Sequence, residues 1–276
     1  MTQVWLNDRL VELADARVSV LDRGLTVGDG VFETMKVVDG VAFALTRHLD
    51  RLTRSAEALG IPMPPESLLR DAIATTARAN AAEVGSVGRL RLTLTHGPGL
   101  LGDPYAGDGE PTLVVTIVRQ QPWPSDSVVA ISRYRRNERS ALTGVKSTSY
   151  AENAVALRAA KAAGADEAIL LNTSDQVCEG TGSNIFVVLE GRLVTPPLDS
   201  GCLNGVTRQL VLHWTDATER PVGAAELAQV SEAFLTSSTR DIHPISRIDG
   251  RDLPSPGPHT RAAMAAWERG SARLDP

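Results

Sequence analysis

Cysteine is scarce in this chain: Cys178 and Cys202 are the two cysteines among its 276 residues. They form neither a Cys-x-x-Cys motif nor the framework of a disulfide-rich fold, which suits a reducing compartment. The five histidines lie far apart without the spacing of metal ligands, so we predict no structural metal. The amino-terminal residues lack the basic and apolar segments of a signal peptide, and we therefore expect a cytoplasmic protein.

Long hydrophobic runs and excess positive charge are also missing. The sequence has no run of about 18 apolar residues, which argues against a membrane span. The net charge is −5, the isoelectric point is about 5.6, and no basic stripe is visible, so nucleic acid is not expected as a partner. Hydrophobic residues make up 42% of the chain, enough for one large or two medium domains.

Breaker residues divide the chain into two parts. Residues 120–125, Gln-Gln-Pro-Trp-Pro-Ser, follow a predicted strand at 112–118 and are typical of a linker. We therefore predict a small amino-terminal domain at 1–119, a linker at 120–125 and a larger, cofactor-binding domain at 126–276. Both parts mix helices with strands, so the fold class is α+β or α/β, with a site expected between the domains.

Local patterns predict individual elements. In the first part, Asp39-Gly40 marks the turn of a hairpin at 37–43, Gly60 ends a helix that contains Leu49, and residues 67–80 form a second helix. Alternating leucines and polar residues predict a strand at 87–95. In the second part we expect strands at 128–133, 167–172, 184–189, 192–194 and 233–237, and helices at 151–163, 205–215, 225–229 and 259–269.

Lys146 is the first candidate for chemistry. It lies among small and hydroxylated residues at 144–153, directly before an alanine-rich helix, which is where a lysine would be held near the interior. Desolvation lowers the pKa of an amine, and a lowered pKa favours imine formation with an aldehyde. Most lysines are solvated surface charges, however, so this interpretation depends on other segments.

Two further segments contain groups that suit a cofactor. Glu179 lies at a tight, glycine-containing turn between two apolar strands, either as an exposed hairpin residue or as a buried acceptor for a protonated ring nitrogen. Gly205 precedes a helix whose first turn contains Val206 and Thr207. The free N–H groups and the dipole of such a helix end favour a phosphate, although an ordinary helix start has the same pattern.

Other candidates for a phosphate are hydroxyl and guanidinium groups. Ser237 and Ser238 belong to four consecutive hydroxylated residues after an apolar strand, a pattern that is also common in plain turns. Arg51 lies beside the apolar stripe of the first helix, where an arginine is usually solvated. Together with the helix start at Gly205 and the hydroxylated run that contains Ser237 and Ser238, Arg51 becomes a candidate for a bidentate phosphate contact.

Together these motifs, with Asp22-Arg23-Gly24 through Phe32-Glu33-Thr34, resemble fold type IV enzymes that depend on pyridoxal 5′-phosphate. This class IV aminotransferase family includes branched-chain and D-amino acid aminotransferases and aminodeoxychorismate lyases, and the resemblance runs from about residue 21 to residue 248. It implies a smaller amino-terminal α+β domain and a larger domain with a mixed, barrel-like sheet. It also implies a homodimer with sites at the subunit interface.

The resemblance implies a role for each candidate. Lys146 would hold the cofactor as an aldimine and would move a proton between the substrate and the cofactor. Glu179 would bind the ring nitrogen, and Tyr150 would lie near the ring hydroxyl, one residue closer to the lysine than in branched-chain enzymes. The phosphate would be held by Arg51, Val206, Thr207 and Ser238, with Ser237 as a neighbour. Arg91, with Arg23 from a partner subunit, would bind a substrate carboxylate.

The favoured function is a transaminase that moves an amino group between a D-amino acid, or a similarly presented primary amine, and a 2-oxo acid. The start of the match, Gly28 to Thr34, lacks the Phe-Glu-Gly ending of branched-chain enzymes. Residues 97–102 also lack the Arg-x-His trap of well-known D-amino acid aminotransferases. Aminodeoxychorismate lyase, a branched-chain aminotransferase and a non-catalytic binding relic are the alternatives. The roles of Arg89, Arg133, Arg135 and Arg136 stay open, as does whether the loop at 97–109 is a lid.

Overall fold

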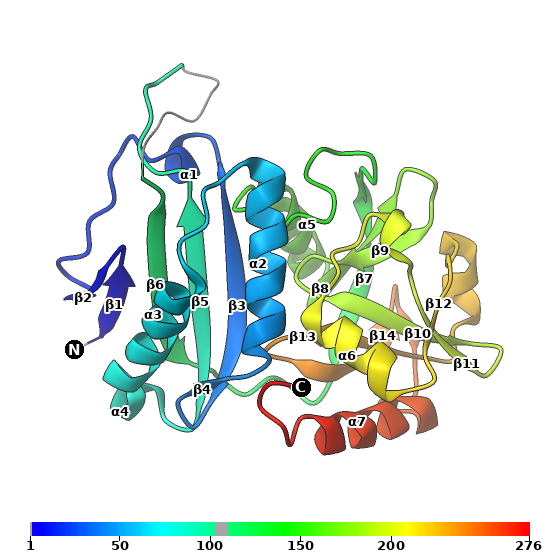
Figure 1. Ribbon diagram of the computed structural model, residues 1–276. Coiled ribbons are helices and arrows are strands. Elements are labelled where there is room, and N and C mark those ends of the chain that lie inside the picture. The colour runs from blue at the N-terminus through cyan, green and yellow to red at the C-terminus, as the bar shows by residue number, and fades with distance from the viewer. Residues whose placement is uncertain (1, 103–109) are drawn as a thin grey trace. The chain divides into compact units, whose positions relative to one another are not determined.

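The computed structural model describes residues 2–102 and 110–276, which divide into two compact units (Figure 1). Unit 1 comprises Met1–Gln121, Val145–Ser149 and Leu274–Pro276. Unit 2 comprises Pro122–Gly144 and Tyr150–Arg273. The change of unit near residue 121 falls within the predicted linker.

We predicted a second domain that runs continuously from residue 126. Unit 2 is instead interrupted. The segment at 145–149, which contains Lys146, belongs instead to unit 1 because its backbone pairs with a strand there. The Phe32 N–H donates to the Lys146 carbonyl at 2.9 Å, and the Thr148 N–H donates to the Gly30 carbonyl at 2.7 Å. These bonds satisfy backbone groups on the strand that would otherwise lie open.

Unit 1 is built on a six-stranded antiparallel sheet in the order β2-β1-β6-β5-β3-β4. Its strands are β1 (Gln3–Leu6), β2 (Arg9–Glu12), β3 (Gly30–Val38), β4 (Val41–Ala42), β5 (Val87–Thr95) and β6 (Thr112–Arg119). The predicted hairpin is confirmed: Asp39 and Gly40 join β3 to β4 with φ of 47° and 83°. Such a pair of left-handed residues matches the twist of a two-residue hairpin.

Three helices, α2 (Leu45–Leu59), α3 (Glu66–Ala79) and α4 (Ala81–Val84), cover the apolar face of this sheet. A fourth, α1 (Arg23–Thr26), is a single turn without buried residues. The 3–4 spacing of Leu49, Leu52 and Ala56 gives α2 one apolar stripe, which packs against Val31 and Met35 of β3 in a common core (Figure 1). The expected end of α2 is also confirmed, since the N–H of left-handed Gly60 donates to carbonyls of the last turn.

Unit 2 contains a nine-stranded mixed sheet in the order β12-β11-β10-β13-β14-β7-β8-β9, with β15 paired to β14. The strands are β7 (Ser127–Arg136), β8 (Glu167–Asn172), β9 (Val177–Gly180), β10 (Asn184–Leu189), β11 (Arg192–Thr195), β12 (Thr218–Glu219), β13 (Glu232–Ser237), β14 (Asp241–Ile248) and β15 (Arg251–Asp252). The helices are α5 (Ala151–Ala162), α6 (Val206–Trp214) and α7 (Pro258–Gly270), with 3₁₀ turns η1 (Leu198–Ser200) and η2 (Ala224–Gln229).

This sheet curls back on itself. β9 is the last strand in the order and β10 lies five places away, yet residues 181–183 alone connect them. Five strand spacings in a flat sheet are about 24 Å, and three residues span only about 10–14 Å. The expected mixed, barrel-like sheet is therefore confirmed, and its curl brings β9 close to β10.

Some details differ from the expected elements. Glu179 lies within β9 and not in the turn, which follows at 181–183. The predicted helix at 225–229 is the 3₁₀ turn η2, and β1, β2, β9, β12, β14 and β15 were not anticipated. Within the proposed lid at 97–109, residues 103–109 lie outside the described residues.

Candidate functional site

In unit 1, Lys146 is held by its backbone against β3 and by its side chain against an aromatic ring. Its N–H donates to Ser55 Oγ of α2 at 3.2 Å, and its carbonyl accepts from Phe32. Its Nζ lies 4.4 Å from the centre of the Phe32 ring, and the side chain is partly buried. An ammonium over an aromatic face is attracted by the electron density of the ring. The amine is thus held in place within unit 1.

Arg91 lies on the same ring as Lys146. Its guanidinium carbon is 3.7 Å from the Phe32 ring centre. The strand register explains this: Phe32 pairs with Thr93 and Thr34 pairs with Arg91, so Arg91 is the diagonal neighbour of Phe32 on one face of the sheet. Two predicted site residues therefore meet at Phe32. Phe32 was not among the predicted site residues, although it alternates with buried Val31 on β3 and so lies on the face opposite the core.

Arg51 is buried in an ion pair. Its Nε donates to Glu33 Oε1 at 2.8 Å and its Nη2 donates to Glu33 Oε2 at 2.6 Å. Arg51 is thus not the solvated charge that is usual for an arginine on a helix, because 5% of the residue is exposed, and its contact with a phosphate stays a prediction. Burial is possible because Glu33, on β3 beneath α2, neutralises the charge and takes up two of its N–H groups.

His48 completes this buried cluster. Its Nδ1 lies 2.6 Å from Glu33 Oε2. Burial alone would raise the pKa of Glu33, but the charges and hydrogen bonds of Arg51 and His48 lower it to about 2. Burial lowers the pKa of His48, and the charges of Arg51 and Lys146 add to that effect against the attraction of Glu33. An ionised Glu33 can only accept, so the proton of this contact lies on His48 Nδ1, which serves as the donor.

Arg23 pairs with Asp29. Its Nε donates to Asp29 Oδ2 at 2.9 Å, and His96 Nδ1 lies 2.9 Å from the same oxygen. Arg23 begins α1, whose amino-terminal cap is Asp22, accepting from the Gly24 N–H at 2.8 Å. The structure thus gives Arg23 a carboxylate partner within unit 1, and its predicted contact with a substrate stays a prediction.

In unit 2, Glu179 is a largely buried acceptor. Its side chain is 12% exposed, its Oε2 accepts from the Leu203 N–H at 3.0 Å, and Arg136 Nη2 lies 3.4 Å from its Oε1. It is not an exposed hairpin residue. A carboxylate that accepts from a backbone N–H and lies beside an arginine is a suitable partner for a protonated ring nitrogen. Arg136, which sequence analysis left open, is thereby placed at this carboxylate.

Tyr150 and Asn153 are both tied to the turn that follows Glu179. The Tyr150 hydroxyl donates to the Thr181 carbonyl at 2.9 Å, and Asn153 Nδ2 donates to the same oxygen at 2.7 Å. Asn153 Oδ1 in turn accepts from Arg136 Nη2 at 3.1 Å. The Tyr150 hydroxyl is therefore linked to the carboxylate of Glu179 through polar contacts of Thr181, Asn153 and Arg136, all within unit 2.

The amino terminus of α6 has the properties of a phosphate site. Its cap residue is Gly205, no side chain caps it, and Val206 and Thr207 are buried. A Cβ on Gly205 would lie 2.0 Å from Asn184 Oδ1, so glycine is required where the chain approaches this amide. Buried, uncapped N–H groups at a helix start need an acceptor, and a phosphate is one that fits.

Ser237 and Ser238 lie at the end of β13, and Ser237 begins the turn to β14. The neighbouring Thr236 hydroxyl is buried and has no protein partner among the described residues. An unsatisfied buried hydroxyl is costly unless a further acceptor or donor reaches it. These residues therefore also fit a group that carries several acceptor oxygens.

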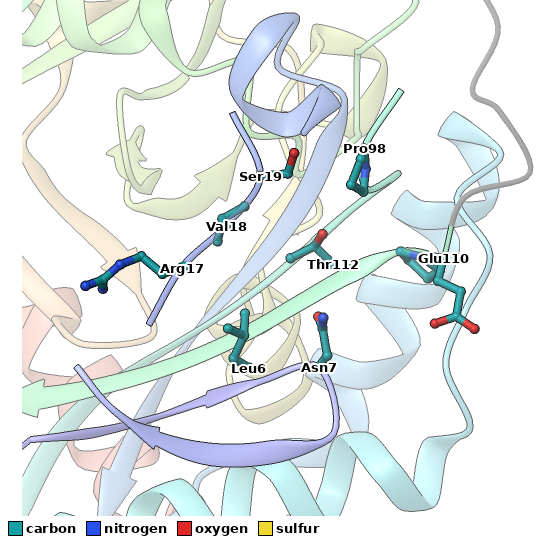
Figure 2. Close-up of a pocket in the computed structure, with 9 residues that line it drawn as sticks. Leu6, Asn7, Arg17, Val18, Ser19, Pro98, Glu110 and Thr112 are labelled. Atoms are coloured by element: carbon teal, nitrogen blue, oxygen red, sulfur yellow. The ribbon is translucent and has the colours of Figure 1, made fainter. Parts of the chain in front are cut away.

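A surface cavity of about 450 Å³ in unit 1 contains none of the predicted site residues (Figure 2). It is lined by Leu6, Asn7, Arg17, Val18, Ser19, Pro98, Glu110, Pro111 and Thr112. Across residues 2–102 and 110–276 we find no group of three or more His, Cys, Asp or Glu side chains arranged for a metal ion. In the same residues, no helix has the length and apolar character needed to cross a membrane.

Comparison with known proteins finds relatives that are named as aminotransferases. The family described as amino-transferase class IV matches residues 30–248. A Methanocaldococcus jannaschii protein named as a branched-chain-amino-acid aminotransferase is 38% identical, covering 90% of this chain and 88% of that protein. A D-alanine aminotransferase from Bacillus licheniformis is 30% identical over 96% of each. The branched-chain aminotransferase of Thermoproteus uzoniensis, solved with norvaline, has a TM-score of 0.90 and 32% identity over 98% of this chain and 94% of that one.

Proposed function

Because the chain belongs to the class IV aminotransferase family, we propose that it moves an amino group between a D-amino acid, or a similarly presented primary amine, and a 2-oxo acid. Enzymes of this family depend on pyridoxal 5′-phosphate, so the chain is a pyridoxal-phosphate-dependent aminotransferase. The family, fold class and cofactor predicted from the sequence are thereby confirmed. The choice of substrate is the proposal.

The residues proposed to hold the cofactor fit it chemically. Lys146 would carry it covalently, Glu179 would accept from the ring nitrogen, and Tyr150 would lie near the ring. The phosphate would be held by Arg51, Val206, Thr207, Ser237 and Ser238. The uncapped amino terminus of α6 and the buried carboxylate of Glu179 support this assignment. When bound, the cofactor supplies an electron sink for the bond that breaks at the substrate's α-carbon.

The observation that supports an amino acid as the substrate, of either configuration, is that Arg91 and Lys146 contact the same Phe32 ring. An amino acid carries its carboxylate and its amino group on one carbon. A cation that binds the carboxylate must therefore lie only a few ångströms from the lysine that moves the α-proton. Arg91 meets this requirement, and we assign it the substrate carboxylate, with Arg23 of a second copy as a further contact.

Two substrate classes have support. The D-amino acid assignment is supported by the D-alanine aminotransferase relative and by Thr34 in place of the glycine typical of branched-chain enzymes. A branched-chain L-amino acid is the second candidate, supported by the higher identity of the Methanocaldococcus jannaschii relative and by the TM-score of the Thermoproteus uzoniensis structure. Either class presents a carboxylate, so Arg91 serves both.

A donor panel tests the proposal. The purified, cofactor-loaded protein is given D-alanine, L-leucine or aminodeoxychorismate, the first two with 2-oxoglutarate, and glutamate, pyruvate and 4-aminobenzoate are measured. Transfer from D-alanine alone supports the proposal, and transfer from L-leucine alone establishes the second candidate. Release of 4-aminobenzoate and pyruvate without any transfer would identify a lyase.

A matched pair of arginine variants tests the carboxylate contact. Arg91→Gln is expected to raise the KM for the amino acid about tenfold or more, as the loss of a charge-assisted hydrogen bond implies. Arg89→Gln is the control: Arg89 lies two residues away on β5, and its Nε donates to Gln120 at 2.9 Å. Equal KM values for the two variants would remove Arg91 from the substrate site.

We also propose that the enzyme is a homodimer in which a second copy covers an apolar surface of unit 1. The surface comprises Val20, Leu25, Val27, Leu100 and Leu101, which are 78%, 69%, 62%, 76% and 74% exposed. The two segments lie together because the Gly99 N–H donates to the Leu21 carbonyl at 3.1 Å. Exposed apolar patches of this kind are typical of interfaces. Sedimentation equilibrium should give a dimer, and Leu100→Ser with Leu101→Ser should weaken it.

A cytoplasmic location is proposed as well. Cys178 and Cys202 are both free thiols and both buried, which is the state expected in a reducing compartment. Fractionation of the source cells, with the protein detected by antibody, is the direct measurement. Recovery outside the cytosolic fraction would contradict this assignment.

A further inference from the structure

The carboxylate of Glu167 is a buried hub in unit 2. Glu167 begins β8 and is 1% exposed. Its Oε2 accepts from Arg240 Nη1 at 3.0 Å, and its Oε1 accepts from the Thr181 N–H at 3.1 Å and from the Thr181 hydroxyl. The Ala168 N–H also donates to Oε1 at 3.2 Å, and these hydrogen bonds and the ion pair stabilise a carboxylate that is removed from water.

On one side, this hub holds the turn between β13 and β14. The Arg240 N–H donates to the Ser237 carbonyl at 3.2 Å, and its guanidinium lies 4.3 Å from the centre of the Trp123 ring. The Arg240 side chain is 11% exposed. It is therefore held by Glu167 and by the aromatic face of Trp123, and it fixes the short turn that contains Ser237 and Ser238.

On the other side, the hub holds the turn that follows Glu179. Thr181 gives both its N–H and its hydroxyl to Glu167. Its carbonyl accepts from Tyr150 and Asn153, and the adjacent Gly180 N–H donates to the Ser183 carbonyl at 2.7 Å. The position of this turn determines where β9 ends, and hence where Glu179 lies.

We infer that Glu167 and Arg240 are positioning residues that couple the two parts of the cofactor site in unit 2. This inference rests on the proposed function, in which Ser237 and Ser238 hold the phosphate and Glu179 holds the ring nitrogen. The two turns are more than 50 residues apart in the sequence, and the Glu167 carboxylate connects them. Loss of the Glu167–Arg240 ion pair loosens the turn that contains Ser237 and Ser238. Loss of the Thr181 contacts loosens the turn that follows Glu179.

Release of the cofactor from the holoenzyme tests the coupling. Glu167→Gln and Arg240→Gln are each expected to speed the release of pyridoxal 5′-phosphate about tenfold or more, as the loss of one charge-assisted hydrogen bond implies. The rate of release is measured, after dilution, as the loss of the visible absorbance of the bound cofactor. The double variant should release at the rate of the faster single variant, because both changes break the same pair. The control is Arg247→Gln, whose ion pair with Asp252 at 2.6 Å is exposed to solvent.

A second ligand separates positioning from a general loss of structure. Pyridoxal, which lacks the phosphate, should bind Arg240→Gln and the wild-type protein with similar affinity, because Arg240 acts on the phosphate side. Thr181→Val, which removes one hydroxyl and keeps the shape of the side chain, should weaken the binding of both ligands. Thr181→Val also allows the coupling to be tested if Glu167→Gln does not fold.

The outcomes are distinct. A wild-type protein that binds no pyridoxal 5′-phosphate would overturn the proposed function. A wild-type protein that retains it, with Arg240→Gln and Thr181→Val releasing it at the wild-type rate, would overturn the coupling alone. Equal weakening of both ligands by Arg240→Gln, with a lower thermal midpoint of the apoprotein, would show a purely structural role and would also overturn it.

Discussion

Arg51 and Glu33 are joined by two parallel hydrogen bonds of 2.8 Å and 2.6 Å in the interior of unit 1. Glu33 is fully buried and Arg51 is nearly so. The pair connects β3 to α2, and both elements also bond to the Lys146 backbone, β3 through the Phe32 N–H and α2 through the Ser55 hydroxyl. This arrangement makes the pair a structural support for the lysine, and its loss has measurable consequences.

Removing the charge of Glu33 should strongly destabilise the protein. Glu33→Gln leaves the buried guanidinium of Arg51 without a counter-charge, and breaking a buried pair in this way costs about 3–5 kcal/mol. Urea unfolding of the apoprotein measures the change in the free energy of unfolding. Glu66→Gln breaks the exposed pair with Arg70 and is the control, with an expected cost below about 1 kcal/mol. Equal costs for the two variants would contradict the account of the buried pair.

The same cluster predicts loss of stability in acid. The pKa of Glu33 is lowered from 4.5 to about 2 in the folded protein, so its contribution is complete above pH 4.5 and is lost as pH falls toward 2. The pKa of His48 is lowered from 6.5, so the unfolded chain takes up this proton first and stability begins to fall below about pH 6.5. Urea midpoints measured between pH 8 and pH 3.5 should decline in acid, and below pH 4.5, where Glu33 contributes, Glu33→Gln should show a weaker decline. A flat profile would refute this prediction.

Phe32 should matter for turnover because Arg91 and Lys146 both lie on its ring. Phe32→Leu keeps an apolar side chain and removes two cation–π contacts, each worth about 0.5–2 kcal/mol. We expect a higher KM for the amino acid and a lower kcat. Phe43→Leu is the matched control, since that ring lies 5.9 Å from Nζ of Lys36, a lysine outside the predicted site. Identical kinetics for Phe32→Leu and the wild-type protein would mean that the ring orients neither cation.

Neutralising Glu179 should slow the chemistry without releasing the cofactor. Glu179→Gln keeps a side chain that can contact the ring, yet it no longer stabilises a proton on the ring nitrogen, so removal of the substrate's α-proton becomes harder. We expect turnover to fall about tenfold or more, equivalent to one charge-assisted hydrogen bond. The control is Glu152→Gln, because Glu152 also pairs with Arg136 but is half-exposed. Full activity of Glu179→Gln would show that the carboxylate has another role.

Strong local patterns predicted much of the fold. Leu90, Leu92 and Leu94 alternate with polar residues, and β5 occupies the range expected from that alternation. The Asp39-Gly40 turn and the Gly60 helix end were also predicted, because each depends on a residue that tolerates positive φ. β14 was missed because Pro244 and the polar residues around it are unlike a central strand.

The contacts that build the candidate site were harder to predict. The residues Phe32 and Glu33 are visible in the motif near the start of the chain, but their partners follow from the register of β3 with β5 and from the packing of α2. Glu167 gave no local signal, since Arg240, its ion-pair partner, is 73 residues away. The sequence therefore indicated candidate side chains for the chemistry, and the structure was needed to show what holds them.

The most direct test of the account is the identity of the residue that carries the cofactor. The holoenzyme is treated with borohydride, which reduces an imine to a stable amine, and is then digested and mapped by mass spectrometry. The account predicts one modified peptide, with the pyridoxyl mass on Lys146, and no modification in a folded Lys146→Ala variant. A pyridoxyl group on any other lysine, or undiminished turnover by Lys146→Ala, would contradict it.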